Sequence, residues 1–315
     1  MNRREFITAL AAAGTMPPLF TRGMHAAVST FQFNCFTKHL QWLDYDETAQ
    51  VLKAAGYDGA DLTVRAGGHV LPERVEEDLP IAVQACAAVG LRVPMIVTDV
   101  TRADPGAERT LRVAKKLSVH IYRMGYLSYD EKLGIEGSVA QLRPQLQDLA
   151  ALNREIGITG AYQNHAGARI GAAIWDLRSL LRGIEASDLG IQYDIKHATA
   201  EGGHSWILGL RLVAEHINCL AVKDFLWQKN GRVWRDDPVP LGSGMVDYQA
   251  FFRAIKELGL HVPITVHVEY PTAHILSPTD SHALKKEKEI AVYKRDLEVT
   301  KELMRRAGFN LKADS

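Results

Sequence analysis

Eight short apolar segments, separated by helical stretches, recur along this chain and limit the folds open to it. The segments lie near residues 31–37, 59–65, 92–98, 119–126, 159–165, 190–196, 218–224 and 263–270. Strands that alternate with helices form parallel sheets, because each parallel connection must cross back over the sheet. Eight such units predict an α/β protein with a single (β/α)8 TIM barrel, a fold that typically takes ~250 residues.

The boundaries of the helices agree with this architecture. Several predicted helices end in the residue expected just beyond a helix terminus, at Gly56, Gly90, Gly157 and Gly259. A charged helix from about Lys285 to Gly308 would close the ring. A doubly wound open sheet is the rival, but no Gly-x-Gly-x-x-Gly turn follows the first segment. With no linker or second domain visible, we predict one barrel over residues 29–315.

Residues 1–28 have a different character. Arg3 and Arg4 precede Phe6 and a short, mildly apolar run with small residues near its end. This order is typical of an export signal, and the paired arginines resemble the twin-arginine type. The apolar run is shorter than the ~20 residues of a spanning helix, so we expect periplasmic export without membrane insertion. A frayed cytoplasmic N-terminus with two chance arginines is the alternative.

Composition excludes several classes of partner. The chain has 315 residues, 47% of them hydrophobic, and Lys plus Arg equals Asp plus Glu at 37 each. This balance gives no electrostatic reason to expect nucleic acid or an anionic membrane as partner. Three widely spaced cysteines form neither a disulfide framework nor a CxxC metal site, so we expect buried thiols. A small-molecule ligand fits best, and homo-oligomerisation stays open.

The later strands end in polar side chains that carry the prediction of an active site. Residues two apart on a strand share a face, so Gln163 and His165 point the same way. Asp194 ends the sixth segment, Lys223 the seventh and Glu269 the eighth. In a barrel these ends converge at one mouth, where the active sites of such folds lie. The sequence therefore predicts an enzyme.

At these residues the chain resembles the xylose-isomerase-like barrel family, which includes sugar phosphate isomerases and epimerases and family 2 AP endonucleases. The Gln163-Asn-His165 segment stands where that family has a Glu before its Asn/His pair. Asp194-x-x-His197 and the Lys223-Asp224 pair match the sixth and seventh strands, and Glu269 matches the eighth. Leu241 to Asp247 resembles the family's Gly-x-Gly-hydrophobic-Asp turn, and Thr63 to His69 carries a motif of its exported members.

The resemblance implies a divalent metal held by Glu, Asp, His and Glu, and this chain departs from that set. Gln163 replaces one Glu and Ala221 the His, which leaves Gln163, Asp194 and Glu269 as the predicted ligands. Two carboxylates with amide oxygens suit Mg²⁺ or Mn²⁺. His165 or His267 in the ligand set would favour Mn²⁺, Fe²⁺ or Zn²⁺ instead. A metal-free Gln–Asp–Glu hydrogen-bond network is the alternative.

The resemblance also implies proton abstraction α to the carbonyl of a sugar or keto-sugar. We predict Glu269 as base, His165 as its proton-handling partner, and Lys223 either as a base with a lowered pKa or as a cation facing an enediolate. Isomerisation or epimerisation is the first prediction. Because one Glu is missing, β-elimination or hydration on 3-keto-glycosides is the second.

Polar residues after the earlier strands are predicted substrate contacts. These are Lys38, Arg65, His69 and Arg123, with His197 from the second half. Arginine forks suit carboxylates or vicinal hydroxyls. A catalytically inactive carbohydrate-binding barrel is the alternative from another class, and Gln163 and Ala221 favour it. Phosphodiester cleavage would need a multi-metal cluster and a basic face, which this sequence does not offer.

Overall fold

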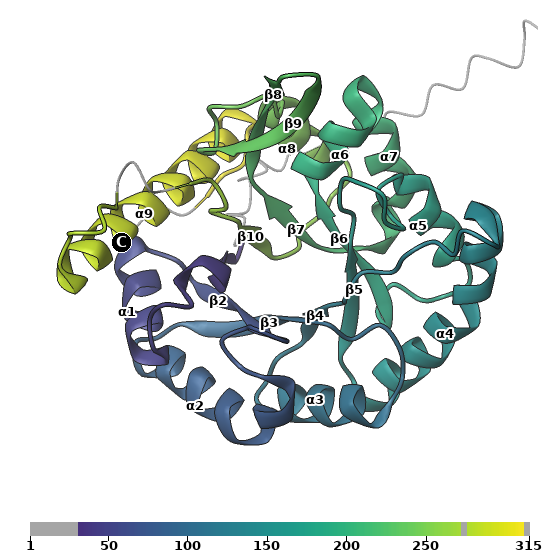
Figure 1. The fold of residues 1–315 in the computed structure, drawn as a ribbon, viewed down its shortest axis with the longest axis horizontal. Helices are drawn as coiled ribbons and strands as arrows, with labels where there is room; N and C mark the ends of the chain where they lie inside the picture. Colours follow the sequence, from purple (N-terminus) through teal and green to yellow (C-terminus); the bar gives the residue numbers. More distant parts are fainter. Residues whose placement is uncertain (1–30, 272–275, 312–315) are drawn as a thin grey trace, which may run out of the picture.

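The computed structural model describes residues 31–271 and 276–311. The predicted export signal, residues 1–28, lies outside the described residues. A closed barrel of eight parallel strands occupies the centre, with helices around it (Figure 1). The barrel strands are β1 (Phe33–Phe36), β2 (Gly59–Val64), β3 (Arg92–Thr98), β4 (Ile121–Arg123), β5 (Thr159–Gln163), β6 (Leu189–Asp194), β7 (Ile217–Val222) and β10 (Ile264–Val266).

The strands follow one another around the barrel in chain order, and β10 closes it by pairing with both β1 and β7. All eight predicted strands are present, so the (β/α)8 prediction is confirmed. The α-helices are α1 (Tyr45–Ala55), α2 (Val75–Ala88), α3 (Pro105–Lys116), α4 (Gly134–Ile156), α5 (Ile174–Leu180), α6 (Ile195–Gly202), α7 (Trp206–Val213), α8 (Tyr248–Glu257) and α9 (His282–Arg306). Short 3-10 turns are η1 (Thr37–Leu40), η2 (Pro72–Arg74), η3 (Gly203–Ser205) and η4 (Ala214–His216).

Local chemistry sets the ends of these helices. Asp44 and Asp247 accept hydrogen bonds from backbone N–H groups of the first turns of α1 and α8, which satisfies donors that a helix cannot pair itself. The predicted terminal glycines all have positive φ, from 65° at Gly259 to 91° at Gly56. Because glycine lacks a Cβ, it adopts this left-handed conformation without strain.

The main hydrophobic core lies between the strands and the helices. Inside the barrel a smaller cluster of Met95, Ala161 and Cys219 fills the level below the mouth. All three cysteines are free and buried, as predicted. Helix α9 packs against α1 and α8 and so covers the first and last strands. Among the described residues, no helix is long and apolar enough to cross a membrane.

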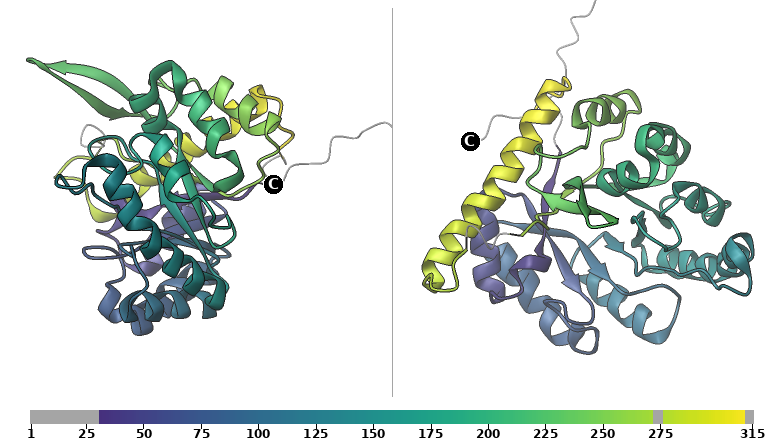
Figure 2. Two further views of the ribbon diagram at one scale, coloured as in Figure 1. Left: turned by 90° about the vertical axis from the view of Figure 1, so that its right-hand side faces the viewer. Right: turned by 45° about the horizontal axis from the view of Figure 1, so that its top comes forward.

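One element was missed by the sequence analysis, the two-stranded hairpin of β8 (Asp224–Asn230) and β9 (Val233–Val239). It follows β7 directly and extends away from the barrel (Figure 2). Lys196 on α6 holds the hairpin in place. Its ammonium donates a hydrogen bond to Asp236 on β9 and lies over the Phe225 ring on β8. The hairpin therefore stands beside the mouth of the barrel.

Asp224 holds the loop that returns from this hairpin to α8. Its carboxylate accepts hydrogen bonds from the backbone N–H groups of Gly242, Gly244 and Val246, at 2.9 to 3.2 Å. A Cβ on Gly244 would lie 2.2 Å from Oδ1 of Asp224, so only glycine fits there. The Leu241–Asp247 motif of the sequence is thus a loop wrapped around one buried carboxylate.

Candidate active site

The predicted polar residues of the second half come together at the carboxyl ends of four neighbouring strands. Gln163 ends β5 and Asp194 ends β6, while Lys223 directly follows β7 and Glu269 lies three residues beyond β10. The register pairs Asp194 with Ala221, which in turn pairs with Thr265. Side chains two residues apart share a face, so these groups project into the barrel interior.

Lys223 is at the centre of this group. Its Nζ lies 2.7 Å from Oε2 of Glu269 and 3.3 Å from Oδ2 of Asp194. The side chain of Lys223 is 6% exposed and that of Asp194 fully buried. A buried ammonium between two carboxylates is held far more firmly than a surface ion pair, because solvent screens it less.

The charges of this triad stabilise one another. Burial alone would lower the pKa of Lys223, but Asp194 and Glu269 together raise it above its ordinary value. Burial alone would raise the pKa of Glu269, but the Lys223 ammonium holds it well below its usual range. These pairings keep Lys223 protonated at neutral pH. The lowered pKa that a lysine base would need is the opposite of what this environment produces.

Backbone contacts fix Asp194 in place. Its Oδ1 accepts from the backbone N–H of His197 at 3.2 Å, which caps the start of α6. Asn164 pairs with the Asp194 backbone twice, because its Nδ2 donates to the carbonyl and its Oδ1 accepts from the N–H. Sequence reasoning gave Asn164 no role. Its position beside Gln163 was visible, but the register that aims it at the next strand was not.

Gln163 connects the carboxylates to an aromatic and cationic side of the mouth. Its Nε2 donates to Oδ2 of Asp194 at 2.8 Å. Its Oε1 accepts from Nη1 of Arg123 at 2.8 Å and from the hydroxyl of Tyr126 at 2.6 Å. These donors define which end of the amide is the carbonyl, since a reversed amide would face two donors with its NH2 group.

His165 has the protonation state of a base. Its Nδ1 lies 2.8 Å from the carbonyl oxygen of Ala166, which can only accept, so Nδ1 carries the proton and Nε2 a lone pair. Burial is the main cause that lowers the pKa of His165, so its ring is neutral at pH 7. The ring reaches the triad through His197, on which it stacks and whose Nε2 lies 3.7 Å from Oδ2 of Asp194.

His197 and His267 are buried on either side of this centre. The His197 ring stacks on that of His165 at 3.8 Å between centroids, and burial holds its pKa well below the usual range. His267 stacks on Phe36 at 4.5 Å, with Nδ1 3.5 Å from Oε1 of Glu269. Neither ring nitrogen of His197 or His267 has a hydrogen-bond partner among the described residues.

The predicted contacts of the first half separate into two groups. Arg65 and Arg123 both face the ring of Phe36, at 5.9 and 5.3 Å, so the structure brings them together at the mouth. Arg123 is 4% exposed, and its Nη1 donates a hydrogen bond to Oε1 of Gln163. Phe36 was not singled out from the sequence, although it is the last residue of the first strand.

Lys38 and His69 lie differently. Lys38 is exposed in the turn after β1. His69 places Nδ1 3.1 to 3.2 Å from the hydroxyls of Thr63 and Thr37, and burial lowers its pKa to about 4. These contacts stabilise the loop after β2, and a role of either residue in substrate binding stays a prediction.

The donor set does not fit the predicted metal. Gln163 turns its carbonyl toward Arg123, Lys223 occupies the space between Asp194 and Glu269, and Ala221 has no ligand atom. Within residues 31–271 and 276–311, no group of three or more His, Cys, Asp or Glu side chains could hold a metal ion.

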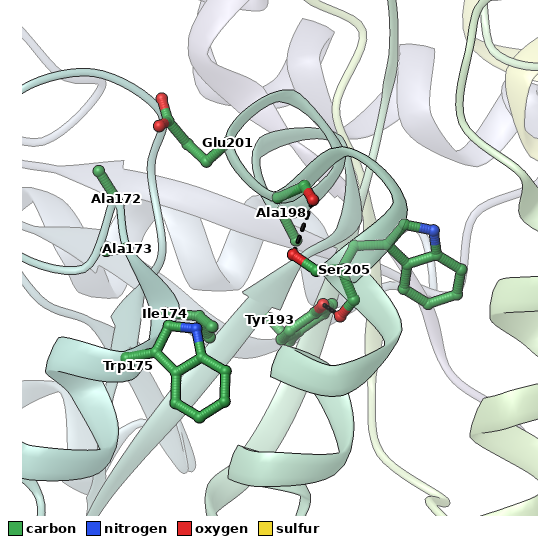
Figure 3. A pocket seen from close by; sticks show the side chains of 10 residues that line it. Ala172, Ala173, Ile174, Trp175, Tyr193, Ala198, Glu201 and Ser205 are labelled. Atoms are coloured by element: carbon green, nitrogen blue, oxygen red, sulfur yellow. Dashed lines mark hydrogen bonds between the residues drawn. The ribbon is translucent and has the colours of Figure 1, made fainter.

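A separate pocket of about 130 Å³ opens outside the barrel wall, between the loop before α5, helix α6 and the start of α7. Figure 3 shows Trp175 on one side of it and Ser205 on the other, with Tyr193 at its base. Glu201 lines it and accepts a hydrogen bond from the backbone N–H of Gly167. The four central polar side chains do not line this pocket, so it is distinct from the mouth.

Solved structures share this fold at low sequence identity. A crystal structure of D-psicose 3-epimerase with D-tagatose from Clostridium cellulolyticum H10 has a TM-score of 0.63 and 10% identity, over 87% of this chain and 99% of that one. The apo 3-keto-D-glucoside 4-epimerase YcjR from E. coli has a TM-score of 0.61 and 11% identity, over 84% and 100%.

A third structure, the IOLI protein with a binding zinc atom, has a TM-score of 0.68 and 16% identity, over 86% of this chain and 99% of that one. No curated protein matches the sequence significantly. The sequence model of the family described as "Xylose isomerase-like TIM barrel" matches residues 49–303, most of the chain. This chain therefore belongs to the xylose isomerase-like TIM barrel family.

Proposed function

We propose that this protein is a sugar isomerase- or epimerase-type enzyme that removes a proton α to the carbonyl of a sugar or keto-sugar. One observation carries the proposal: the mouth of the barrel contains both a neutral His165 with an Nε2 lone pair, stacked on His197, and the charged Lys223 held by two carboxylates. Such chemistry needs a base for the C–H proton and a positive group for the developing oxyanion. Sugar epimerases among the similar solved structures support the substrate class.

The proposed step is a simple proton transfer. The α C–H bond breaks, its proton moves to Nε2 of His165, and the electron pair forms the C=C bond of an enediolate. The charge moves to the former carbonyl oxygen, where a fixed cation stabilises it without reorganisation. Asp194 acts on Lys223 as a positioning residue, and Asn164 fixes Asp194 in turn.

For Glu269 we propose a different part from the one that the sequence predicted. Its carboxylate pairs with Lys223, which makes it a weak proton acceptor. It comes from β10, whereas His165 follows β5, so the two stand on opposite sides of Lys223 around the mouth. We propose that His165 is the principal base. Glu269 orients the Lys223 ammonium and accepts hydrogen bonds from substrate hydroxyls.

The second candidate is β-elimination or hydration on a 3-keto-glycoside. The observation that favours it is Gln163, which cannot take a proton and stands where the family resemblance implies a second base. One base returns a proton to the face from which it came. Epimerisation by proton exchange between two faces calls for two such groups. A keto-glucoside enzyme among the similar structures fits this class of substrate.

One experiment separates these candidates. The protein is incubated with ketoses and with 3-keto-glycosides in D2O, and NMR follows both deuterium at the α carbon and release of the aglycone. Exchange without bond cleavage supports the isomerase, and free aglycone supports the lyase. Saturable binding of these sugars without either reaction would identify a carbohydrate-binding barrel instead.

Cellular location is a separate proposal, which rests on residues 1–28 alone. The arginine pair and the short apolar run favour twin-arginine export of the folded protein. N-terminal sequencing of protein from a fractionated host tests this. A mature chain that starts near residue 29 in the periplasm supports export, and cytoplasmic protein that keeps Met1 contradicts it.

A further inference from the structure

The space between the two carboxylates of the mouth already contains a cation. Nζ of Lys223 lies 2.7 Å from Glu269 and 3.3 Å from Asp194. A divalent ion ligated by both would lie ~2.0–2.6 Å from the same two oxygens. It would overlap the ammonium, so a metal at these two oxygens would have to displace the buried lysine.

Gln163 cannot make up for this loss as a ligand. The one atom through which an amide ligates a metal is its carbonyl oxygen. In Gln163 that oxygen accepts from both Arg123 and Tyr126, at 2.8 and 2.6 Å, and so faces away from the carboxylates. The end that faces Asp194 is the NH2 group, which is a donor and has no lone pair to offer a metal.

Ala221 removes the remaining ligand position on this half of the barrel. It pairs with Asp194 on one side and with Thr265 on the other, and it is fully buried. Its methyl group offers no ligand atom, and Lys223, two residues on, shares its face and reaches Asp194 and Glu269. Three features of this site therefore agree in disfavouring a metal. The Gln163 carbonyl faces Arg123, Ala221 has no ligand atom, and the Lys223 ammonium contacts both carboxylates.

We propose that Lys223 replaces the divalent ion in this barrel, and that the protein binds and polarises the substrate carbonyl with its own ammonium group. This inference rests on the proposed function and adds that the Lys223 ammonium is the positive group facing the substrate carbonyl. An ammonium has three N–H donors. Among the described residues, only Glu269 and Asp194 contact it within ion-pair distance. One donor is therefore left for the carbonyl oxygen, which becomes the enediolate oxygen when the α proton moves to His165.

The first test measures metal binding rather than activity. Mn²⁺ and Zn²⁺ are titrated calorimetrically into the wild type, Lys223→Met and the triple variant Gln163→Glu/Ala221→His/Lys223→Met, and retained metal is counted after dialysis. Lys196→Met is the matched control, a buried lysine outside the mouth that pairs with Asp236. The wild type and the control should retain well under one equivalent.

The triple variant should bind one equivalent at least about 100-fold more tightly than the wild type, because it restores two ligands and removes the competing cation. Retention of one equivalent by the wild type, lost in Asp194→Ala, would overturn the proposal. That comparison stands even if the triple variant fails to fold.

Chelation separates this inference from the proposed function. Deuterium exchange into the substrate that is unchanged after EDTA treatment supports both. Exchange that EDTA abolishes and Mn²⁺ restores overturns the role of Lys223 and leaves the proposed function intact. Absence of metal together with absence of exchange on every keto-sugar overturns both the proposed function and the inference that rests on it.

Discussion

Nζ of Lys223 lies 2.7 Å from Oε2 of Glu269, and the two residues follow strands β7 and β10, which pair directly in the barrel. Each holds the other in its charged form, in a place where either charge alone would be costly. The mouth of this barrel is thus arranged around a fixed ammonium. The predictions below follow from that arrangement and from the neutral His165 beside it.

Replacing Lys223 with Met should destabilise the fold at pH 7 by about 3 kcal/mol, because two buried carboxylates lose their counter-charge. Lys196→Met removes one pairing with the half-exposed Asp236 and should cost about 1 kcal/mol or less. Urea unfolding measures both values. Equal losses in the two variants would mean that the Lys223 ion pairs contribute no more to the free energy of unfolding than the Lys196 pair does.

The stability lost in Lys223→Met should return partly in acid. In the wild type the pKa of Glu269 is depressed, so its contribution is present above the unfolded pKa near 4.5 and lost as pH falls. Without the ammonium this contribution disappears, and protonation relieves the buried charge. The stability difference between the two proteins should therefore shrink below about pH 5, as thermal unfolding across pH would show. A constant difference contradicts this.

Replacing His165 with Asn should reduce kcat/KM by about 10²- to 10⁴-fold, the usual contribution of a general base. His120→Gln, on an exposed histidine remote from the mouth, is the control and should leave activity unchanged. Circular dichroism confirms that both variants fold. An active His165→Asn enzyme would move the base to Glu269.

The pH profile gives an independent test of the same residue. Burial lowers the pKa of His165 from 6.5, so the base is already free at neutral pH. We expect kcat/KM to rise with pH and to level off below about pH 6.5. A profile that continues to rise toward pH 9 would indicate a different base.

Asp61, inside the barrel below the mouth, should make the wild type less stable as pH rises. Burial raises its pKa to about 7, although the positive charge of Arg123 opposes this. Folded protein keeps a proton on Asp61 that unfolded protein releases near pH 3.8, so the contribution of Asp61 to stability is greatest below that pH and falls until about pH 7. Asp61→Asn should remove up to about 4 kcal/mol of this decline, whereas exposed Glu73→Gln should not.

Gly244→Ala should destabilise the loop held by Asp224. The added Cβ would lie 2.2 Å from Oδ1 of Asp224 and 2.4 Å from the Phe225 carbonyl oxygen. Overpacking of this kind costs about 1–3 kcal/mol. Gly106→Ala, whose Cβ would meet nothing closer than 3.3 Å, is the control. Similar melting temperatures for the two variants would show that the loop relaxes freely.

The sequence predicted the barrel well because strand and helix periods differ and alternate eight times. It missed the β8–β9 hairpin, although Asn230-Gly231 is a turn signal that pointed to it. Both faces of the outer part of the hairpin are exposed, so polar residues occupy both. The sequence therefore lacks the alternation of apolar and polar residues that is typical of a half-buried strand.

The sequence predicted which residues of the second half gather at the mouth, but only some of the contacts between them. Alternation along strands placed Gln163, Asp194, Lys223 and Glu269 on one face. Which way the Gln163 amide points depends on Arg123, forty residues earlier, and no local pattern encodes that contact. The metal prediction followed the family resemblance and the residue types, whereas the structure turns the Gln163 carbonyl toward Arg123 and pairs both carboxylates with Lys223.

The most direct test of the account is α-carbon deuterium exchange in D2O, followed by NMR, with EDTA-treated wild type, His165→Asn and Lys223→Met on the same keto-sugars. We predict exchange in the wild type and its loss in both variants. Exchange that persists in both variants, or a wild type that binds these sugars without exchanging the α proton, would contradict it.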